Sequence, residues 1–263
     1  MTEGTTLITG ASDGIGAVYA DRLARRGHNL ILVARRAEKL AALAEQLHAE
    51  TGVSVETISA DLAKADDLAR IEARLRDDAS ITGLVNNAGI AGEDTFVTAD
   101  PAYLTGMIDL NVLAVTRLSA AIAPRLAAQG AGKGSGTIIN ITSVTALMPD
   151  GFTAVYPATK AFVLAFTEAL NAELAPRGVR VQAVLPGITR TAIWDEDKIA
   201  AIPADMVMDV GDMVDAALAG LDLGETITIP SLPDNADLDY FIAARNALRP
   251  NLSRKLPAAR YTA

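Results

Sequence analysis

TTLITGASDGIG, residues Thr5 to Gly16, is a short apolar segment that runs into three glycines. Its β-branched and apolar residues, Thr5–Thr9, predict a strand that ends at Gly10. Glycines permit a tight turn and let a phosphate come close to the backbone, and the helix that follows adds N–H groups and a favourable dipole. The stretch predicts a strand–turn–helix unit that binds a phosphate. The alternative interpretation is a tight turn without a ligand.

The rest of the chain repeats this alternation of strand and helix. Further strands are predicted at Asn29–Ala34, Val53–Ala60, Gly83–Asn86, Thr137–Thr142, Val179–Leu185 and Thr226–Ile229. Helices are predicted at Gly16–Arg26, Ala37–Thr51, Ala65–Asp78, Pro101–Gln129, Ala158–Leu174 and Asp212–Leu221. We expect Pro124 to kink or divide the longest helix. The pattern predicts an α/β fold: one domain over residues 1–263, with a doubly wound parallel seven-stranded sheet and helices on both faces.

Composition narrows the class of protein. Half of the 263 residues are apolar, there is no cysteine, and the formal net charge is −9. Disulfides, thiolate nucleophiles and cysteine-held metals are therefore excluded, and no histidine cluster supports a metal. An acidic chain repels nucleic acid. Apolar runs are too short for a membrane span and no signal-peptide pattern is present, so we expect a cytoplasmic protein with no membrane partner.

The residues after the second predicted strand indicate the cofactor. A chain that binds NAD usually carries an acid there for the ribose 2′-hydroxyl, but this chain has Arg35 and Arg36. A guanidinium matches a phosphate in charge and geometry, so the pair predicts NADP(H). The alternative is an exposed basic pair that begins a helix. Asp61 suits the adenine amino group or, equally, the cap of a turn.

Four polar residues form the candidate catalytic set. Tyr156 and Lys160 lie four apart on one helical face, and Pro157 fits a first helical turn. A neighbouring ammonium would favour the phenolate of a tyrosine that exchanges a proton with an alcohol or carbonyl oxygen. Ser143 could donate to that oxygen or cap a turn. Asn111, in mid-helix, could hold a relay water near Lys160 or face solvent.

The chain resembles the short-chain dehydrogenase/reductase family over about Thr5 to Thr191. The motifs appear in the order of that family: TGASDGIG, Asp61-Leu62, Asn86-Asn87-Ala88-Gly89, Asn111, Ser143, Tyr156-Pro-Ala-Thr-Lys160 and Pro186-Gly187-Ile188-Thr189-Arg190-Thr191. The resemblance implies a Rossmann fold and an enzyme that transfers a hydride between NADP(H) and a carbonyl or alcohol carbon.

The resemblance also implies the role of each residue. Tyr156 would be the acid/base, Lys160 would lower its pKa and bind the nicotinamide ribose, Ser143 would orient the substrate oxygen, and Asn111 would support a proton relay. Ile188 and Thr191 would hold the carboxamide. The predicted cofactor contacts are Gly10, Ser12, Asp13, Gly14, Ile15, Gly16, Arg35, Arg36, Asp61, Leu62, Asn87, Ala88, Gly89, Tyr156, Lys160, Pro186, Gly187, Ile188, Thr189 and Thr191.

Two segments remain for the substrate and for assembly. Residues 192–212 have no clear periodicity and include Trp194 and Met206, which predicts a lid over a hydrophobic ketone or secondary alcohol. Met148 and Phe152 would line the same pocket from the catalytic side. Residues 231–263 form an extension whose predicted helix, Asp237–Leu248, closes the pocket or buries a subunit interface. We expect a homodimer or homotetramer. The alternative functions are a 3-ketoacyl-type reductase and a non-catalytic, dinucleotide-binding regulatory protein.

Overall fold

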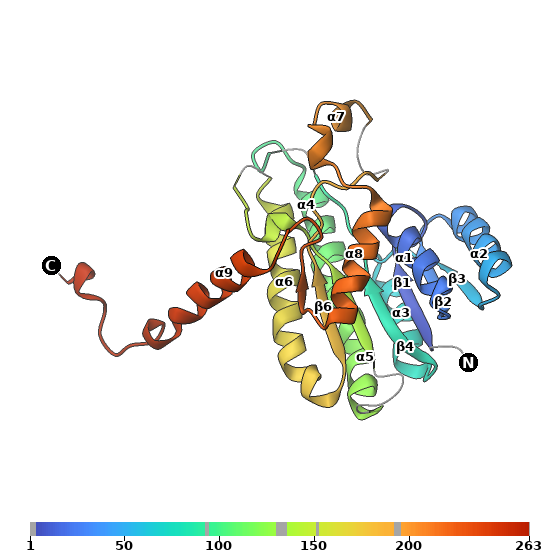
Figure 1. Cartoon of the computed structure of the whole chain (residues 1–263), viewed down its shortest axis with the longest axis horizontal. Helices are drawn as coiled ribbons and strands as arrows, with labels where there is room; N and C mark the ends of the chain where they lie inside the picture. Colours follow the sequence, from blue (N-terminus) through green and yellow to red (C-terminus); the bar gives the residue numbers. More distant parts are fainter. Residues whose placement is uncertain (1–3, 93–94, 130–135, 151–152, 192–195, 263) are drawn as a thin grey trace. The chain divides into compact units, whose positions relative to one another are not determined.

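The computed structural model describes residues 4–92, 95–129, 136–150, 153–191 and 196–262. The chain divides into two compact units, Met1–Pro230 and Ser231–Ala263, and the second begins where the extension is predicted to begin. The first unit contains the sheet (Figure 1). The second contains helix α9 (Ala236–Ala247) and the short 3-10 helices η5 (Arg249–Asn251) and η6 (Ala259–Tyr261).

Seven parallel strands form one sheet in the order β3-β2-β1-β4-β5-β6-β7. They are β1 (Thr5–Thr9), β2 (Asn29–Ala34), β3 (Val55–Ser59), β4 (Ile81–Asn86), β5 (Thr137–Ile141), β6 (Arg180–Val184) and β7 (Ile227–Thr228). The predicted seven-stranded, doubly wound fold is confirmed. The strand order reverses direction between β1 and β4, so a crevice for ligands is expected beyond the carboxyl ends of these two strands.

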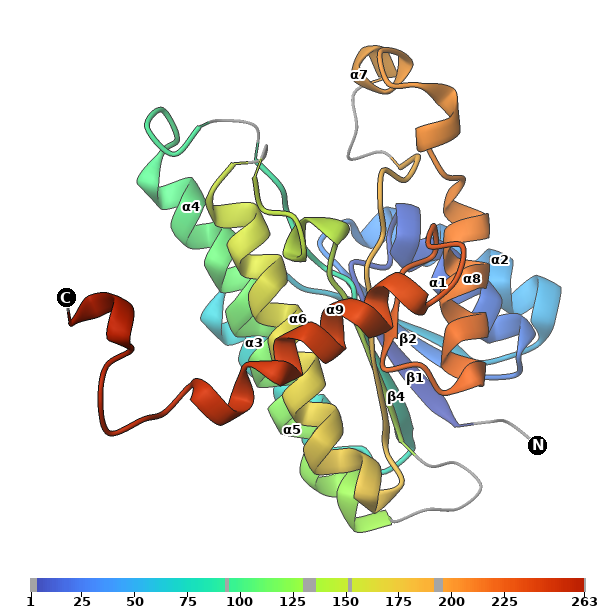
Figure 2. The same cartoon turned by 60° about the vertical axis from the view of Figure 1, so that its left-hand side comes forward.

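Helices cover both faces of the sheet and enclose two apolar cores (Figures 1 and 2). On one face lie α1 (Gly14–Arg25), α2 (Ala37–Thr51) and α8 (Val210–Leu223), where Tyr19, Leu40 and Met213 are fully buried. On the other lie α3 (Ala65–Asp77), α5 (Val115–Gln129) and α6 (Val155–Leu174), where Ile71 and Ile122 are fully buried. The short helix α7 (Glu196–Ala200) stands beyond the carboxyl ends of the strands (Figure 2).

The long predicted helix contains three segments: α4 (Pro101–Ile108), the π-helical segment η1 (Asp109–Ala114) and α5. Of the two expected effects of Pro124, division of the helix is wrong, because α5 continues through Pro124 to Gln129. Pro124 and Ala120 are both exposed, so the carbonyl that loses its N–H partner can bond to water. The irregularity lies instead at η1.

The stretch Pro101–Gln129 is also long and apolar enough, by length and composition, to cross a membrane. In the structure its apolar side packs on the sheet, with Leu118, Ile122 and Leu126 buried in the core. It therefore serves here as a core helix.

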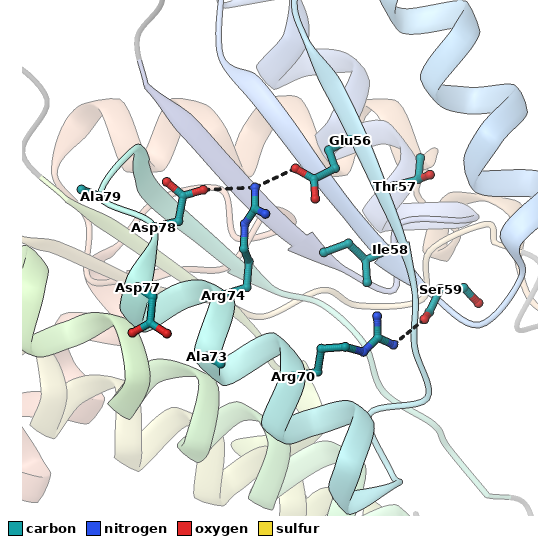
Figure 3. Close-up of a pocket in the computed structure, with 10 residues that line it drawn as sticks. All are labelled: Glu56, Thr57, Ile58, Ser59, Arg70, Ala73, Arg74, Asp77, Asp78 and Ala79. Carbon is teal, nitrogen blue, oxygen red and sulfur yellow. Dashed lines mark hydrogen bonds and ion pairs between the residues drawn. The ribbon is translucent and has the colours of Figure 1, made fainter.

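Polar side chains protect the open edge of the sheet at β3. A groove of about 950 Å³ runs between this strand and α3 (Figure 3). Arg70 donates to the backbone carbonyl of Ser59 at 2.8 Å, and Arg74 pairs with Glu56 at 2.7 Å and with Asp78 at 3.1 Å. These charged groups occupy the edge and discourage another strand from pairing with it.

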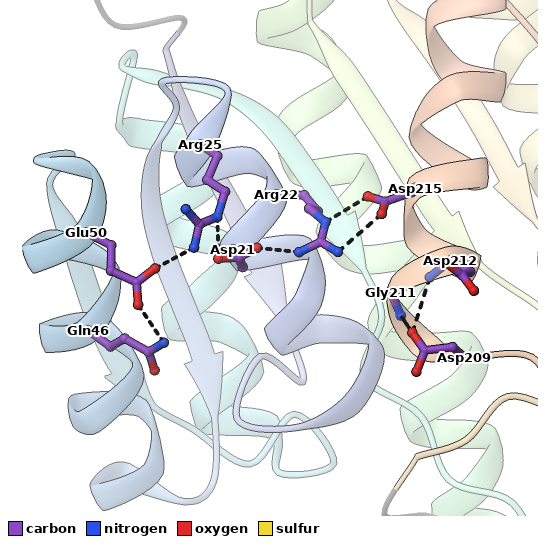
Figure 4. Close-up of polar contacts among 9 residues, drawn as sticks. All are labelled: Asp21, Arg22, Arg25, Gln46, Glu50, Asp209, Gly211, Asp212 and Asp215. Carbon is purple, nitrogen blue, oxygen red and sulfur yellow. Dashed lines mark hydrogen bonds and ion pairs between the residues drawn. The ribbon is translucent and has the colours of Figure 1, made fainter.

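Ion pairs connect α1 with both neighbouring helices (Figure 4). Arg22 bonds to Asp215 of α8 at 2.7 Å, and Arg25 bonds to Glu50 of α2. Asp209 begins α8 by accepting from the N–H of Gly211 at 2.7 Å. Each exposed pair contributes little by itself, but together they fix the position of the helix that follows the predicted lid.

Candidate active site

The glycine loop brings the N-terminus of α1 to the carboxyl end of β1. Gly10 and Gly14 have φ of 65° and 52°, in the left-handed region that favours glycine. A Cβ on Gly16 would lie 2.4 Å from the carbonyl oxygen of Gly10. Asp13 caps α1, since its Oδ1 accepts from the N–H of Gly14 at 2.8 Å. The glycines thus let the loop pack tightly at the N-terminus of α1, a position at which proteins bind phosphate, and we call this loop the glycine cradle.

The segment after β4 braces this loop. The Asn87 side-chain amide donates to the carbonyls of Thr9 at 2.9 Å and Gly10 at 3.2 Å. The Thr9 hydroxyl accepts from the N–H groups of Asn87 and Ala88, both at 3.0 Å. The structure therefore brings the predicted residues Asn87 and Ala88 directly against the glycine loop.

A group of cations lies beside the loop at the end of β2. The Arg36 guanidinium donates to the Ser12 hydroxyl at 2.9 Å, and Lys39 Nζ contacts Asp13 at 2.9 Å. The hydrogen bond from Lys39 lowers the pKa of the Asp13 carboxyl. Arg35 is exposed, and its side chain makes no hydrogen bond or ion pair among the described residues. Arg35 is thus the cation most accessible to an anionic ligand.

Lys39 was not predicted from the sequence. It lies three residues after Arg36, so the two side chains share one face of α2 and both reach the Ser12–Asp13 end of the glycine loop. Helical periodicity applied to the basic pair would have found it.

Asp61 follows β3 and caps a turn. Its Oδ1 accepts from the N–H of Ala63 at 3.2 Å, and its own N–H donates to Asp67 at 2.8 Å. This geometry is the turn-capping alternative raised from the sequence. Leu62 is buried in the core.

Tyr156 and Lys160 come together at the start of α6. The helix begins at Val155, so Pro157 falls in its first turn, as expected. Lys160 is almost fully buried, its Nζ donates to the Ile141 carbonyl at 3.1 Å, and this nitrogen lies 5.6 Å from the centre of the Tyr156 ring.

Ser143 lies next to Tyr156. Its hydroxyl oxygen accepts from the N–H of Thr145 at 3.2 Å and so caps the 3-10 turn η2 (Val144–Ala146). The same side chain hydrogen-bonds to Tyr156, which lowers the pKa of this tyrosine. Ser143 therefore serves as a turn cap and as a neighbour of the phenol.

Burial shifts the pKa values of Tyr156 and Lys160 in opposite directions. Burial raises the pKa of Tyr156, and the Ser143 hydrogen bond opposes that shift only in part. Burial lowers the pKa of Lys160 to about 8. The Lys160 ammonium donates its hydrogen bond to the Ile141 carbonyl and lies 5.6 Å from the centre of the Tyr156 ring. The protein groups by themselves therefore hold Tyr156 in its protonated form.

Asn111 lies in η1 and is only 2 % exposed, so the solvent-facing alternative is wrong. Its amide donates to the Ile90 carbonyl at 2.8 Å and accepts from the Ile90 N–H at 2.9 Å. A Cβ on Gly89 would lie 3.1 Å from Asn111 Oδ1 and 3.6 Å from Lys160 Nζ. The side chains of Asn111 and Lys160 therefore both lie next to Gly89, and a larger residue at position 89 would crowd Asn111.

The segment Pro186–Thr191 links the catalytic set to the glycine loop. The Pro186 carbonyl accepts from Val144, the residue after Ser143, at 3.1 Å. At its other end, a Cβ on Gly14 would lie 3.3 Å from Thr191. Between them, Thr189 forms a parallel bridge with Met208. Gly187 and Ile188 therefore lie between the two halves of the site, while Phe152 and Trp194 lie outside the described residues.

The buried lysine gives a pH prediction. Its pKa is about 8 in the folded chain and near its ordinary 10.5 in the unfolded one, so between these values the unfolded chain binds more protons. The free energy of unfolding should therefore rise with pH, by about 2 kcal/mol between about pH 7.5 and 9.5, relative to Lys160→Met. Urea unfolding across this range measures the slope. Lys64→Met removes an exposed lysine as the control, and equal slopes for wild type and Lys160→Met would contradict the prediction.

Comparison with known proteins identifies the class. Residues 4–200 match the family model of the short chain dehydrogenases. The chain therefore belongs to the short-chain dehydrogenase family, whose members are oxidoreductases acting on alcohol and carbonyl carbons. A curated relative, very-long-chain 3-oxoacyl-CoA reductase-B of Danio rerio, is 34% identical over 71% of this chain and 60% of its own length. The chain thus spans about three fifths of that relative.

Two solved structures align along almost the whole chain. A short-chain dehydrogenase from Sphingobium yanoikuyae in complex with NADPH is 48% identical, with a TM-score of 0.93, and the alignment covers 98% of this chain and 99% of that one. The bulky-bulky ketone specific alcohol dehydrogenase from Comamonas testosteroni is 44% identical, with a TM-score of 0.90, and 98% of each chain is covered.

Proposed function

We propose that this protein is an NADP(H)-dependent oxidoreductase that transfers a hydride between the nicotinamide and a bulky hydrophobic ketone or its secondary alcohol. The observation that carries the proposal is the buried meeting of Tyr156, Ser143 and Lys160 at the carboxyl ends of β5 and the neighbouring strands. The glycine cradle at Gly10–Gly16 and the exposed cation Arg35 fit a dinucleotide with a 2′-phosphate.

Cofactor and side chains have separate roles in the proposed reaction. Bound NADP(H) supplies or accepts the hydride. In the direction of reduction, Tyr156 donates its phenolic proton to the carbonyl oxygen, and Ser143 donates a hydrogen bond to the same oxygen. The raised pKa of Tyr156 suits this direction, since it keeps the proton available. Lys160 and Asn111 position the ribose and a relay water that returns the proton.

The substrate class rests on the solved relative that is named for bulky-bulky ketones and on the residues around the site. The exposed Met148 follows the turn that Ser143 caps, and the exposed Met206 lies in the segment that Met208 ties to Thr189. Unbranched, polarizable side chains of this kind adapt to bulky apolar ligands.

A second candidate is reduction of 3-oxoacyl thioesters, favoured by the curated relative named for that activity. The deciding assay follows NADPH oxidation with diaryl and alicyclic ketones beside long-chain 3-oxoacyl-CoA. The proposal predicts faster turnover of the bulky ketones. Faster turnover of the thioesters would establish the second candidate, and cofactor binding without any turnover would favour a regulatory protein.

The cation group gives a prediction on cofactor choice. Arg35→Ser is expected to weaken NADPH binding about tenfold and to leave NADH binding unchanged, because it removes a charge that only the 2′-phosphate meets. Asp13→Asn keeps an effective helix cap but frees Lys39 and Arg36, so NADPH should bind more tightly. Calorimetric titration with both cofactors measures these changes. A loss of NADH affinity equal to the NADPH loss in Arg35→Ser would contradict the assignment.

A further inference from the structure

The second unit, Ser231–Ala263, carries large apolar side chains that are exposed. We call this unit the arm. Its exposed apolar residues are Tyr240, Phe241, Leu248, Leu252, Leu256 and Tyr261. Leu252 and Leu256 are 72% and 75% exposed. Together the six side chains offer roughly 600–700 Å² of surface, close to the about 800 Å² that each partner buries in a stable interface.

The arm also differs from the rest of the chain in charge. From Tyr240 to the C-terminus there are five basic residues and no acidic one. The whole chain has 23 basic and 32 acidic side chains, so the preceding residues have 18 basic and 32 acidic ones. The arm as a whole has five basic and three acidic residues, a charge of +2, and its basic residues all follow Tyr240, while residues 1–230 have 18 basic and 29 acidic residues, a charge of −11. This complementarity favours a protein surface of the same composition over an anionic membrane, which would repel the body.

One part of the body offers a matching surface. Residues 196–225 contain eight acidic side chains and a single lysine. Asp215 and Asp222 are already paired, with Arg22 and Arg26. Other exposed aspartates of this segment make no ion pair within the described chain; they are Asp197, Asp205, Asp209 and Asp212, and we call them the acidic face. The exposed Met206 lies beside Asp205 and adds an apolar contact.

We propose that the arm docks on the acidic face of a second copy of this chain. Arginines such as Arg249 and Arg254 meet the unpaired aspartates, while Leu252 and Leu256 cover the exposed Met206. A two-fold axis makes the contact reciprocal, so each copy contributes one arm and one acidic face. Both solved relatives align over 98% of this chain, which includes most of the 33-residue arm, so the arm is a shared element of these proteins.

The absence of cysteine in the sequence allows a specific test. Leu256→Cys, labelled with a photoreactive benzophenone maleimide, is prepared in natural and ¹⁵N forms, mixed in equal amounts, equilibrated and irradiated. Mass spectrometry then identifies the cross-linked peptides. We expect cross-links from residue 256 to residues 196–225, with about half of them joining a light and a heavy peptide, as random pairing of two copies requires. Glu45→Cys, an exposed control on α2, should give no such mixed pairs.

Several outcomes would overturn the proposal. Cross-links confined to peptides of one isotope would show docking within a chain, and mixed cross-links elsewhere would show a different interface. Flotation of the unmodified chain with vesicles containing 30% phosphatidylserine would show a membrane-binding arm. In support, Arg254→Glu with Lys255→Glu should raise the dissociation constant of the dimer at least tenfold in sedimentation equilibrium, while Arg254→Lys should not. None of these readouts depends on the proposed activity.

Discussion

Tyr156→Phe is expected to lower the turnover of a bulky ketone by about 10²–10⁴-fold while NADPH binding stays unchanged. The substitution removes the hydroxyl that donates a proton and keeps the buried ring near Lys160 Nζ. Because the loss falls on the chemical step, kcat should fall far more than the cofactor dissociation constant rises. Single-turnover kinetics and fluorescence titration with NADPH separate the two.

An exposed tyrosine provides the matched control. Tyr261→Phe removes the same atom from a side chain that is exposed, and turnover should not change. Full turnover in Tyr156→Phe would show that another group carries the proton. Equal losses of turnover and NADPH affinity would assign Tyr156 to cofactor binding alone.

The second large effect is expected from Gly16→Ala. The added Cβ would lie 2.4 Å from the Gly10 carbonyl oxygen and 2.6 Å from the Asn87 amide nitrogen. The first of these atoms belongs to backbone that cannot rotate away, so the whole loop must shift. We expect the free energy of unfolding to fall by about 1–3 kcal/mol and the NADPH dissociation constant to rise more than tenfold. Urea unfolding and calorimetric titration test the two parts.

Gly106→Ala is the control, because a Cβ there meets no atom within 4 Å and the residue lies inside α4. It should raise the stability by about 0.5–1 kcal/mol and leave cofactor binding unchanged. Normal NADPH affinity in Gly16→Ala would contradict the role of the glycine cradle.

Much of the fold could be predicted from the sequence because the strands are short, apolar and bounded by glycine or polar residues. The sequence could not show where the long helix becomes irregular. Proline is a strong local signal, so Pro124 is expected to kink or divide the helix, but the helix continues through it, because its exposed position tolerates the missing hydrogen bond. The π-helical segment at Asn111 depends on hydrogen bonds to Ile90, which lies 21 residues earlier. Such a tertiary cause leaves no local pattern.

The candidate site was predictable wherever a motif fixed the backbone. The glycine loop, Asn87 and the Tyr156–Lys160 spacing all lie where the motifs placed them relative to the strands. The pKa shifts of the site residues could not be predicted from the sequence. The direction of the Tyr156 pKa shift depends on burial and on the hydrogen bond from Ser143, and neither follows from the spacing of two residues.

The backbone contacts of Met208 have a consequence for how this enzyme could acquire new specificities. Its N–H donates to the Ile188 carbonyl, and its carbonyl accepts from Arg190, both at 2.9 Å. These bonds close a loop at its base, so the segment between Arg190 and Met208 can be lengthened or shortened at a small entropic cost. Ile188 and Arg190, which hold Met208 by these hydrogen bonds, keep their geometry when the loop changes. Evolution, or a protein engineer, can therefore change the length of that loop without disturbing the segment that carries Ile188 and Thr189.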